Sequence, residues 1–581
     1  MPSPPFFSGI TLKTTPKAYF REQDKSRPPE ETVAWARGLF ARLGERVLRK
    51  SLRIDTGRLD IPVYLSLCGP EASALTGTQK QMGKGATLAQ AEASALMELA
   101  ERYSLFNFLK NIDFPLLIAP EMPEPVMDFT QAAKAVRHPE DDLEKARRVY
   151  ELLPQTWAWA KNLTSGREEV IPLSWFWAIN EYNGPAAGNC QEEAVLQSLC
   201  EVVERHACAL VSLHKTPTPA IDPQSVSDPV ARELLGKYEK AGIKVFLKDF
   251  TCGLGIPTVA ALCYDPATFP EKSEIVYAAG TATSPQKALI RALTEVAQLA
   301  GDFAHHTSYL VSALPKFATL AEADYVTRAA GTVPISALPD VSRDDFLAEI
   351  EACVAALRER GLAVYTLDIS HPRLGIPAVY TIIPGAHFAS RTTGTDVVFH
   401  AAKMASQLAD PAQALSVLQQ MAGEAGESYY LPFFQALALL NLARPAEALA
   451  ALEAALGLNP PPQDAASIHT QRGVALKDMA RYAEAKKALS LAAAYTEPHQ
   501  EVYNLLGFCH FKLGEYEKAI EAFSRAIEIE PGLAINYANI GSNLRELGRF
   551  EEACQMYQHA LDLDPTLDFA RENLEKLKAR G

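Results

Sequence analysis

Hydrophobic and polar positions follow two different patterns along the chain, and the pattern changes near residue 395. Before that point, short runs rich in β-branched residues, such as 244–247, 258–264 and 378–383, are separated by long stretches with a helical period. Apolar runs of strand length bounded by glycine and proline predict strands, whereas apolar residues three and four positions apart predict amphipathic helices. We therefore expect residues 1–395 to form an α/β domain of mixed sheets and long amphipathic helices.

After residue 395 the pattern is helical throughout and recurs every 34 residues. Gly507, Tyr516, Ala519, Phe523, Ala526 and Pro531 return as Gly541, Phe550, Ala553, Tyr557, Ala560 and Pro565. This spacing resembles the tetratricopeptide repeat, a pair of helices in which small residues allow a close approach. One pair cannot bury its apolar face alone, so residues 396–581 are expected to form an all-α solenoid with about four clear repeats, a capping helix and a concave groove.

Length, charge and cysteine content narrow the functional classes. The 581 residues exceed the roughly 250–300 that one hydrophobic core supports, which favours more than one domain. A net charge of −14 opposes nucleic-acid binding, and nine cysteines without a CxxC pair argue against a disulfide framework or a thiolate zinc site. The chain shows no apolar run long enough to span a membrane and no signal-peptide pattern, which favours a cytoplasmic protein without membrane contact.

Three predicted helices of the first part carry polar side chains on one face. These are Ser94, Glu98 and Glu101 in the first helix, Glu193, Gln197, Glu201 and Glu204 in the second, and Arg291 and Glu295 in the third. One interpretation is a set of solvated acidic faces. However, the second face contains no lysine, so its carboxylates would repel one another unless a cation lay among them. Oxygen ligands of this kind suit Mg²⁺ bridging substrate phosphates, which Lys84, Arg205 and Arg291 could contact directly.

The order and spacing of these residues resemble the signature of a known family. The motifs S-x3-E-x2-E-R, N-x3-E-x3-Q-x3-E-x2-E-R and R-x3-E begin at Ser94, Asn189 and Arg291, and KSRPPEETV, LDIPVY and LGIPAVYTIIPG accompany them. Together they are similar to the YcaO family, whose members bind ATP and Mg²⁺ and use ATP to activate a peptide-backbone amide. Neither GxGxxG nor GxxxxGK[ST] occurs, so the nucleotide would be held without a standard phosphate loop.

The resemblance implies roles for individual residues in an ATP- and Mg²⁺-binding domain at 1–395. Those that would hold Mg²⁺ or orient its waters are Glu98, Glu101, Glu193, Gln197, Glu201, Glu204 and Glu295. Those that would contact the nucleotide or its phosphates are Lys25, Thr32, Lys84, Ser94, Asn189, Arg205 and Arg291. Asn189 also precedes the second helix, as an N-cap residue would. The catalytic base is not identified.

The reaction that follows amide activation stays open. Family members that form azolines commonly end in a PxPxP tail, whereas here Pro384 and Gly385 lead into the helical repeats. Azoline cyclodehydration, backbone thioamidation and an accessory role in ribosomal-protein methylthiolation are therefore retained as hypotheses. The repeat groove would dock the peptide or protein substrate, a sulfur-delivery protein or a methylthiotransferase, or would join two copies as a homodimer. A second hypothesis is a scaffold in which the ATP site serves only as a switch.

Overall fold

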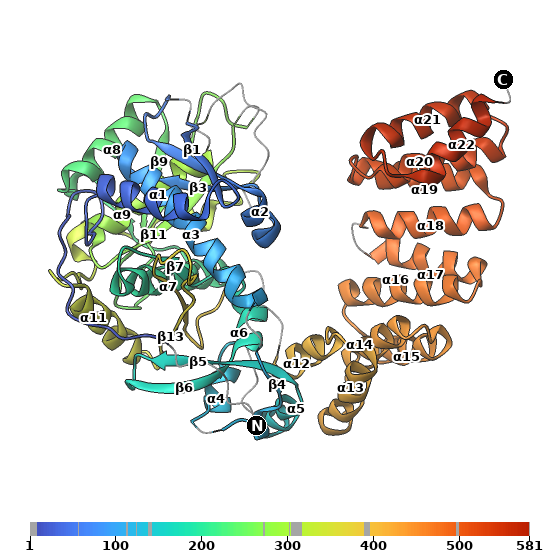
Figure 1. Cartoon of the computed structure of the whole chain (residues 1–581), viewed down its shortest axis with the longest axis horizontal. Coiled ribbons are helices and arrows are strands. Elements are labelled where there is room, and N and C mark those ends of the chain that lie inside the picture. Colours follow the sequence, from blue (N-terminus) through green and yellow to red (C-terminus); the bar gives the residue numbers. More distant parts are fainter. Residues whose placement is uncertain are drawn as a thin grey trace. The chain divides into compact units, whose positions relative to one another are not determined.

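In the computed structural model the chain forms two units (Figure 1). The first contains residues 1–138 and 154–395, and the second contains residues 139–153 and 396–581. The structure describes residues 9–579 except 56, 112–113, 124, 137–141, 271–272, 301–302, 304–316, 389–395 and 496–498. Within these described residues, no helix is both long and apolar enough to cross a membrane.

The first sheet of the first unit lies just before the first motif helix. Strands β1 (Leu48–Arg53), β2 (Val63–Cys68) and β3 (Lys80–Lys84) pair antiparallel in that order, and α2 (Pro70–Thr76) joins β2 to β3. Helix α3 (Leu88–Asn111) packs on this sheet and α1 (Pro29–Leu43) packs on α3, burying Phe40, Leu96 and Tyr103 together. A Cβ at Gly83 would lie 2.0 Å from the backbone nitrogen of Ala95, so only glycine permits this approach of β3 to α3.

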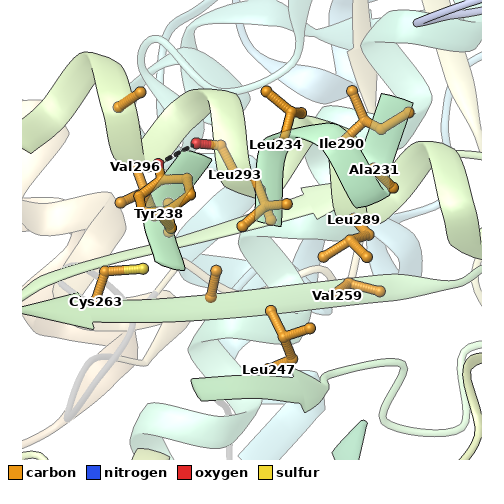
Figure 2. Packing of buried hydrophobic residues seen from close by; sticks show 14 of the residues in the cluster. Ala231, Leu234, Tyr238, Leu247, Val259, Cys263, Leu289, Ile290, Leu293 and Val296 are labelled. Carbon is orange, nitrogen blue, oxygen red and sulfur yellow. Dashed lines mark hydrogen bonds between the residues drawn. The ribbon is translucent and has the colours of Figure 1, made fainter. Parts of the chain in front are cut away.

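A second sheet supports the third motif helix. Its order is β11 (Val276–Thr281), β10 (Thr258–Tyr264), β9 (Lys244–Asp249), β8 (Ala220–Ile221) and β12 (Thr332–Val333), with only the β8–β12 pair parallel among these neighbours. Helix α9 (Pro285–Ala300) packs on β11 and β10, and α8 (Pro229–Lys240) packs on α9 and β9. Figure 2 shows their apolar core, in which the Tyr238 hydroxyl donates a hydrogen bond to the Leu293 carbonyl oxygen at 2.6 Å. The packing fixes the rotation of α9.

A third sheet supports the second motif helix. Its order is β4 (Leu116–Leu117), β5 (Gln155–Asn162), β13 (Tyr365–Asp368), β14 (Ala378–Ile382) and β7 (Pro185–Ala187), and β6 (Arg167–Pro172) also pairs with β5. Helix α7 (Gln191–His214) packs on β14 and β7, and α11 (Phe346–Arg358) packs on α7. Leu199, Val203, Ile350 and Val379 belong to the shared core. Helices α4 (Phe129–Ala133), α6 (Leu173–Asn180) and α10 (Asp324–Thr327) also belong to this unit.

The second unit is built from helices. In chain order they are α12 (Val397–Ser406), α13 (Pro411–Ala425), α14 (Tyr430–Asn441), α15 (Pro445–Gly457), α16 (Pro462–Asp478), α17 (Tyr482–Tyr495), α18 (Gln500–Lys512), α19 (Tyr516–Ile529), α20 (Ala534–Glu546), α21 (Phe550–Leu563) and α22 (Asp568–Lys578). One further helix, α5 (Leu143–Glu151), comes from the middle of the first unit's sequence and packs against α12 and α13. Its residues Ala146, Val149 and Tyr150 are buried there.

The 34-residue period has a packing cause. In three successive pairs, a glycine of the first helix lies against a large side chain of the second: Gly473 against Leu489, Gly507 against Phe523 and Gly541 against Tyr557. A Cβ on these glycines would come within 2.5, 2.7 and 3.1 Å of the facing side chains, respectively. The predicted architecture, an α/β domain followed by a tetratricopeptide solenoid, is confirmed.

Candidate active site

The three motif helices α3, α7 and α9 converge on one cavity of about 140 Å³. Strand β3, the segment 22–32 and Ala187 of β7 also line it. Ten of the residues predicted for the site line this cavity: Lys25, Thr32, Lys84, Ser94, Glu98, Glu101, Asn189, Glu193, Gln197 and Arg291. A volume of this size holds several water molecules or the polar part of a ligand. Segments far apart in the sequence therefore contribute to a single polar site.

The predicted residues outside this wall flank it. Glu295 forms an ion pair with Lys84, which joins α9 to β3. Glu204 accepts a hydrogen bond from the backbone N–H of Thr281 at 2.9 Å and lies 3.9 Å from the Arg291 guanidinium. Glu201 and Arg205 follow on α7. Although desolvation opposes the charge of its guanidinium, the charges of Glu204 and Glu201 keep the pKa of the exposed Arg205 above its ordinary value.

Glu193 is held by donors from the N-terminal segment. The Lys25 ammonium lies 3.3 Å from Glu193 Oε1, and Ser26 donates to Oε2 from its backbone N–H at 3.0 Å and from its hydroxyl at 2.9 Å. Although burial favours the neutral acid, Lys25 and these hydrogen bonds lower the pKa of Glu193. In this arrangement the carboxylate is ionised and its oxygens are already occupied by protein donors.

Asn189 does not cap the second helix, contrary to expectation. The N-cap of α7 is Cys190, whose sulfur accepts a hydrogen bond from the Glu193 backbone N–H at 3.4 Å. The Asn189 side chain instead donates to both Glu193 oxygens, at 3.1 and 3.2 Å, and accepts a hydrogen bond from the Thr32 hydroxyl at 2.9 Å. Asn189 is buried and joins α1 to the start of α7.

Another part of the site contains three carboxylates that repel one another, those of Glu98, Glu101 and Glu201. Arg102 lies 3.1 Å from Glu98 and 3.4 Å from Glu101 through its Nε. Burial and the charges of Glu98 and Glu201 nevertheless raise the pKa of Glu101 well above its ordinary value, and burial with Glu98 and Glu204 raises the pKa of Glu201 to about 7. Arg102 and Arg205 therefore do not neutralise this group, and a bound cation would stabilise the ionised forms.

The donor set fits Mg²⁺, although it is not gathered as a metal site. Carboxylate and carboxamide oxygens are the hard ligands that Mg²⁺ prefers. Within the described part of the chain, however, no three histidine, cysteine or acidic side chains are already grouped as metal ligands. Arg102 and Lys84 occupy carboxylates that a metal would use, so metal binding requires these pairs to rearrange.

Two cations beside the acidic residues are suited to phosphate. The Arg291 guanidinium donates to the Gln197 side-chain oxygen at 2.9 Å, and its buried Nε has no hydrogen-bond partner among the described residues. Burial and the charge of Arg291 lower the pKa of Lys84 to about 8. An anion would relieve their mutual repulsion once the Lys84–Glu295 pair opens, which favours a phosphate chain between β3 and α9.

Sequence reasoning missed several residues of the site. Arg102 ends the motif that begins at Ser94, and Ser26 follows Lys25, so adjacency to predicted residues could have indicated both. Glu22 and Gln90 also line the cavity. No motif marks either residue, because their positions depend on how the N-terminal segment and α3 pack.

Comparison with known proteins finds two family models that match separate parts of the chain. Residues 82–387 match the family model described as YcaO cyclodehydratase, ATP- and Mg²⁺-binding. Residues 498–566 match a tetratricopeptide-repeat model. The first match covers the three motif helices and two of the sheets in full.

Two proteins are similar to this chain in sequence, and a solved structure is similar to it in fold. An uncharacterised protein of Methanothermobacter thermautotrophicus is 30% identical over 392 residues, which cover 61% of this chain and 93% of that protein. An uncharacterised protein in the tfuA 3′ region of Rhizobium leguminosarum bv. trifolii is 29% identical over 222 residues, covering 35% of this chain and 51% of that protein. A heterocyclase in complex with substrate and cofactor superposes with a TM-score of 0.52 at 22% identity, covering 65% of this chain and 54% of that one. The chain thus spans about half the length of the last two proteins.

Proposed function

The chain belongs to the YcaO family of ATP- and Mg²⁺-binding proteins, and from this premise we propose that it is an ATP-dependent enzyme that activates a backbone amide of a peptide or protein. The observation that carries the proposal is the single cavity on which acidic, carboxamide and basic side chains converge from α3, α7, α9 and β3. Burial and the neighbouring carboxylate charges, which raise the pKa values of Glu101 and Glu201, support a cation in this place.

The proposal divides the site into two groups of side chains. Lys84, Arg205 and Arg291 neutralise the phosphates, while Lys25, Thr32, Ser94 and Asn189 position the rest of the nucleotide. Glu98, Glu101, Glu193, Gln197, Glu201, Glu204 and Glu295 hold Mg²⁺ or its waters. Mg²⁺ supplies charge neutralisation at the transferring phosphoryl group.

ATP makes the amide oxygen a leaving group. A nucleophile adds to the amide carbon, the amide oxygen takes the γ-phosphoryl group, and the oxygen then departs as inorganic phosphate, leaving ADP. If the nucleophile is a cysteine, serine or threonine side chain of the substrate, the product is an azoline. If it is delivered sulfide, the product is a thioamide. The helical second unit docks the substrate or a sulfur-delivery partner.

An isotope experiment tests this chemistry. A peptide substrate that carries ¹⁸O at the reacting carbonyl should give ¹⁸O-labelled inorganic phosphate and ADP in step with product. An ordinary ATPase takes that oxygen from water, so unlabelled phosphate would contradict direct phosphoryl transfer to the amide. Label in AMP, with release of pyrophosphate, would indicate adenylation of the same oxygen instead.

The helical second unit favours one alternative, an accessory or scaffold protein such as a methylthiotransferase accessory factor. Tetratricopeptide repeats serve as docking surfaces, and this unit accounts for residues 396–581. In that case Glu201→Gln should abolish Mg²⁺-dependent ATP use and leave the partner's reaction intact. The enzyme proposal expects the same variant to stop product formation.

A further inference from the structure

Glu22 is a buried carboxylate in the cavity wall that the proposed chemistry does not use. It lies in a short hairpin, in which Tyr19 and Lys25 exchange backbone hydrogen bonds at 3.0 and 2.9 Å. The tip of this hairpin is held against α9, because Lys287 donates to the carbonyl oxygen of Phe20 at 2.9 Å. Glu22 has an exposed fraction of 0% and lines the same cavity as Lys84 and Arg291.

One oxygen of Glu22 is unsatisfied. Oε2 accepts a hydrogen bond from the Tyr19 hydroxyl, whereas Oε1 has no hydrogen-bond partner and no ion pair with Glu22 is found in the described part of the chain. A buried carboxylate oxygen without a partner is costly, and in native proteins such an oxygen is normally satisfied by a protein group, an ordered water or a bound ligand. The missing donor is therefore to be sought in what fills the cavity.

The chemistry of a carboxylate decides which part of ATP it meets. An ionised carboxylate only accepts hydrogen bonds, and it repels phosphate oxygens. Lys84 and Arg291, the cations that suit the phosphates, line the cavity from β3 and α9, and Glu22 lines it from the hairpin. The donors that ATP offers away from its phosphates are the amino group of adenine and the two ribose hydroxyls.

We propose that Glu22 is a specificity residue for the nucleotide, whose free oxygen accepts a hydrogen bond from a donor of the adenosine moiety. The inference rests on ATP binding and goes beyond it, since it assigns the orientation of the nucleotide and predicts which analogues the site rejects. The Tyr19 hydroxyl donates to the other oxygen of Glu22, so one oxygen is left for the nucleotide.

The test measures binding by the full-length chain with Mg²⁺ present. The ligands are ATP, 2′-deoxy-ATP, 3′-deoxy-ATP and purine riboside triphosphate, which lacks the amino group. Wild-type protein should bind the analogue that lacks the recognised donor about tenfold more weakly than ATP, or worse, because a hydrogen bond to a charged group is lost. Glu22→Ala should bind ATP and that analogue equally, and Glu22→Gln, which keeps the side-chain volume, should discriminate less than wild type.

Two further variants separate recognition from structure. Tyr19→Phe keeps the Glu22 carboxylate and should keep the discrimination, and Glu30→Gln, at an exposed position of α1, is the matched control. If Glu22→Ala and Glu22→Gln discriminate like wild type, or if Tyr19→Phe loses discrimination to the same degree, direct recognition by Glu22 is overturned while ATP binding stands. If the wild-type chain binds none of these nucleotides, the proposed function is overturned with it.

Discussion

Glu201 shows what a shared acidic face does to a single carboxyl group. Burial and the charges of Glu98 and Glu204 raise its pKa to about 7, against the opposing effect of Arg205 and Arg102. An unfolded chain would give the same group a pKa of about 4.3. Above that pH the ionised form is less favourable in the folded chain than in the unfolded chain, so stability is lost as pH rises from about 4.3 to about 7.

Replacing this carboxyl group should therefore stabilise the metal-free protein. We expect Glu201→Gln to raise the free energy of unfolding by roughly 1–3 kcal/mol at pH 8, with a gain that shrinks as pH falls toward 4.5. Urea unfolding in EDTA across this pH range measures the effect. Glu528→Gln, at an exposed site paired with Arg525, should change stability by less than about 0.5 kcal/mol.

The same substitution should impair Mg²⁺-dependent ATP use. A glutamine removes the charge that a cation would neutralise, so stability and function move in opposite directions. Loss of the fold together with normal nucleotide turnover in the surviving protein would show instead that Glu201 has a structural role.

For single residues, the sequence predicts which side chains share a helix face, because helical spacing determines it. The sequence does not predict side-chain contacts between distant segments, because these depend on the tertiary fold. Ser94, Glu98 and Glu101 could be placed on one face because their spacing is local. The contact of Lys25 and Ser26 with Glu193 joins residues far apart in the chain, and no period reveals it. The burial of Glu22 depends on the hairpin that carries it, so the spacing of residues in the sequence does not predict that Glu22 belongs to the site.

Among the elements, the repeat helices show how one small residue sets the distance between two helices. Gly507 of α18 lies against the ring of Phe523 in α19, and a Cβ there would approach the ring to 2.7 Å. The aromatic ring fills the space that glycine leaves. Because the same contact recurs in neighbouring pairs, the 34-residue period could be recognised in the sequence and assigned to the right fold.

Gly507→Ala should destabilise the helical unit although alanine is the better helix former. Alanine gains about 1 kcal/mol in helix propensity, but the clash with Phe523 should cost more, about 1–3 kcal/mol, because the ring must move within a packed interface. Thermal unfolding of the full chain should show a lower transition for this variant.

Gly423→Ala is the control for this experiment. Gly423 lies in α13 with nothing within 4 Å of the added Cβ, so the propensity gain should appear alone and raise the transition. Equal effects of the two substitutions would contradict the packing explanation of the repeat.

At the scale of the whole molecule, α5 belongs to the second unit although its sequence lies within that of the first, which the pattern of hydrophobic positions did not reveal. The helix is encoded between α4 and β5, yet it buries Ala146, Val149 and Tyr150 against α12 and α13. A division of the chain at residue 395 therefore separates α5 from its partners. Sequence patterns indicate that α5 is a helix with one apolar side, but they do not indicate which unit that side contacts.

We predict that residues 1–395 bind ATP in an Mg²⁺-dependent manner, because every residue assigned to the site lies within them. This fragment should also self-associate through the uncovered face of α5. A version in which a short glycine-serine linker replaces residues 140–152 should bind ATP equally well and stay monomeric. Calorimetry and light scattering measure the two properties. A folded fragment that does not bind ATP, when the full chain does, would show that the first unit is not independent.

The placement of α5 also has a consequence for how the two units of such a chain evolve. A recombination event that appended a repeat array to the end of an ATP-binding protein would have to supply, at a second and internal position, a helix whose apolar face matches α12 and α13. Exchange of the array between lineages would break that match unless both positions moved together. Substitutions at Val149 or Tyr150 should therefore be accompanied by changes in the facing residues of α12 and α13. Helix α5 and these two helices are thus expected to coevolve.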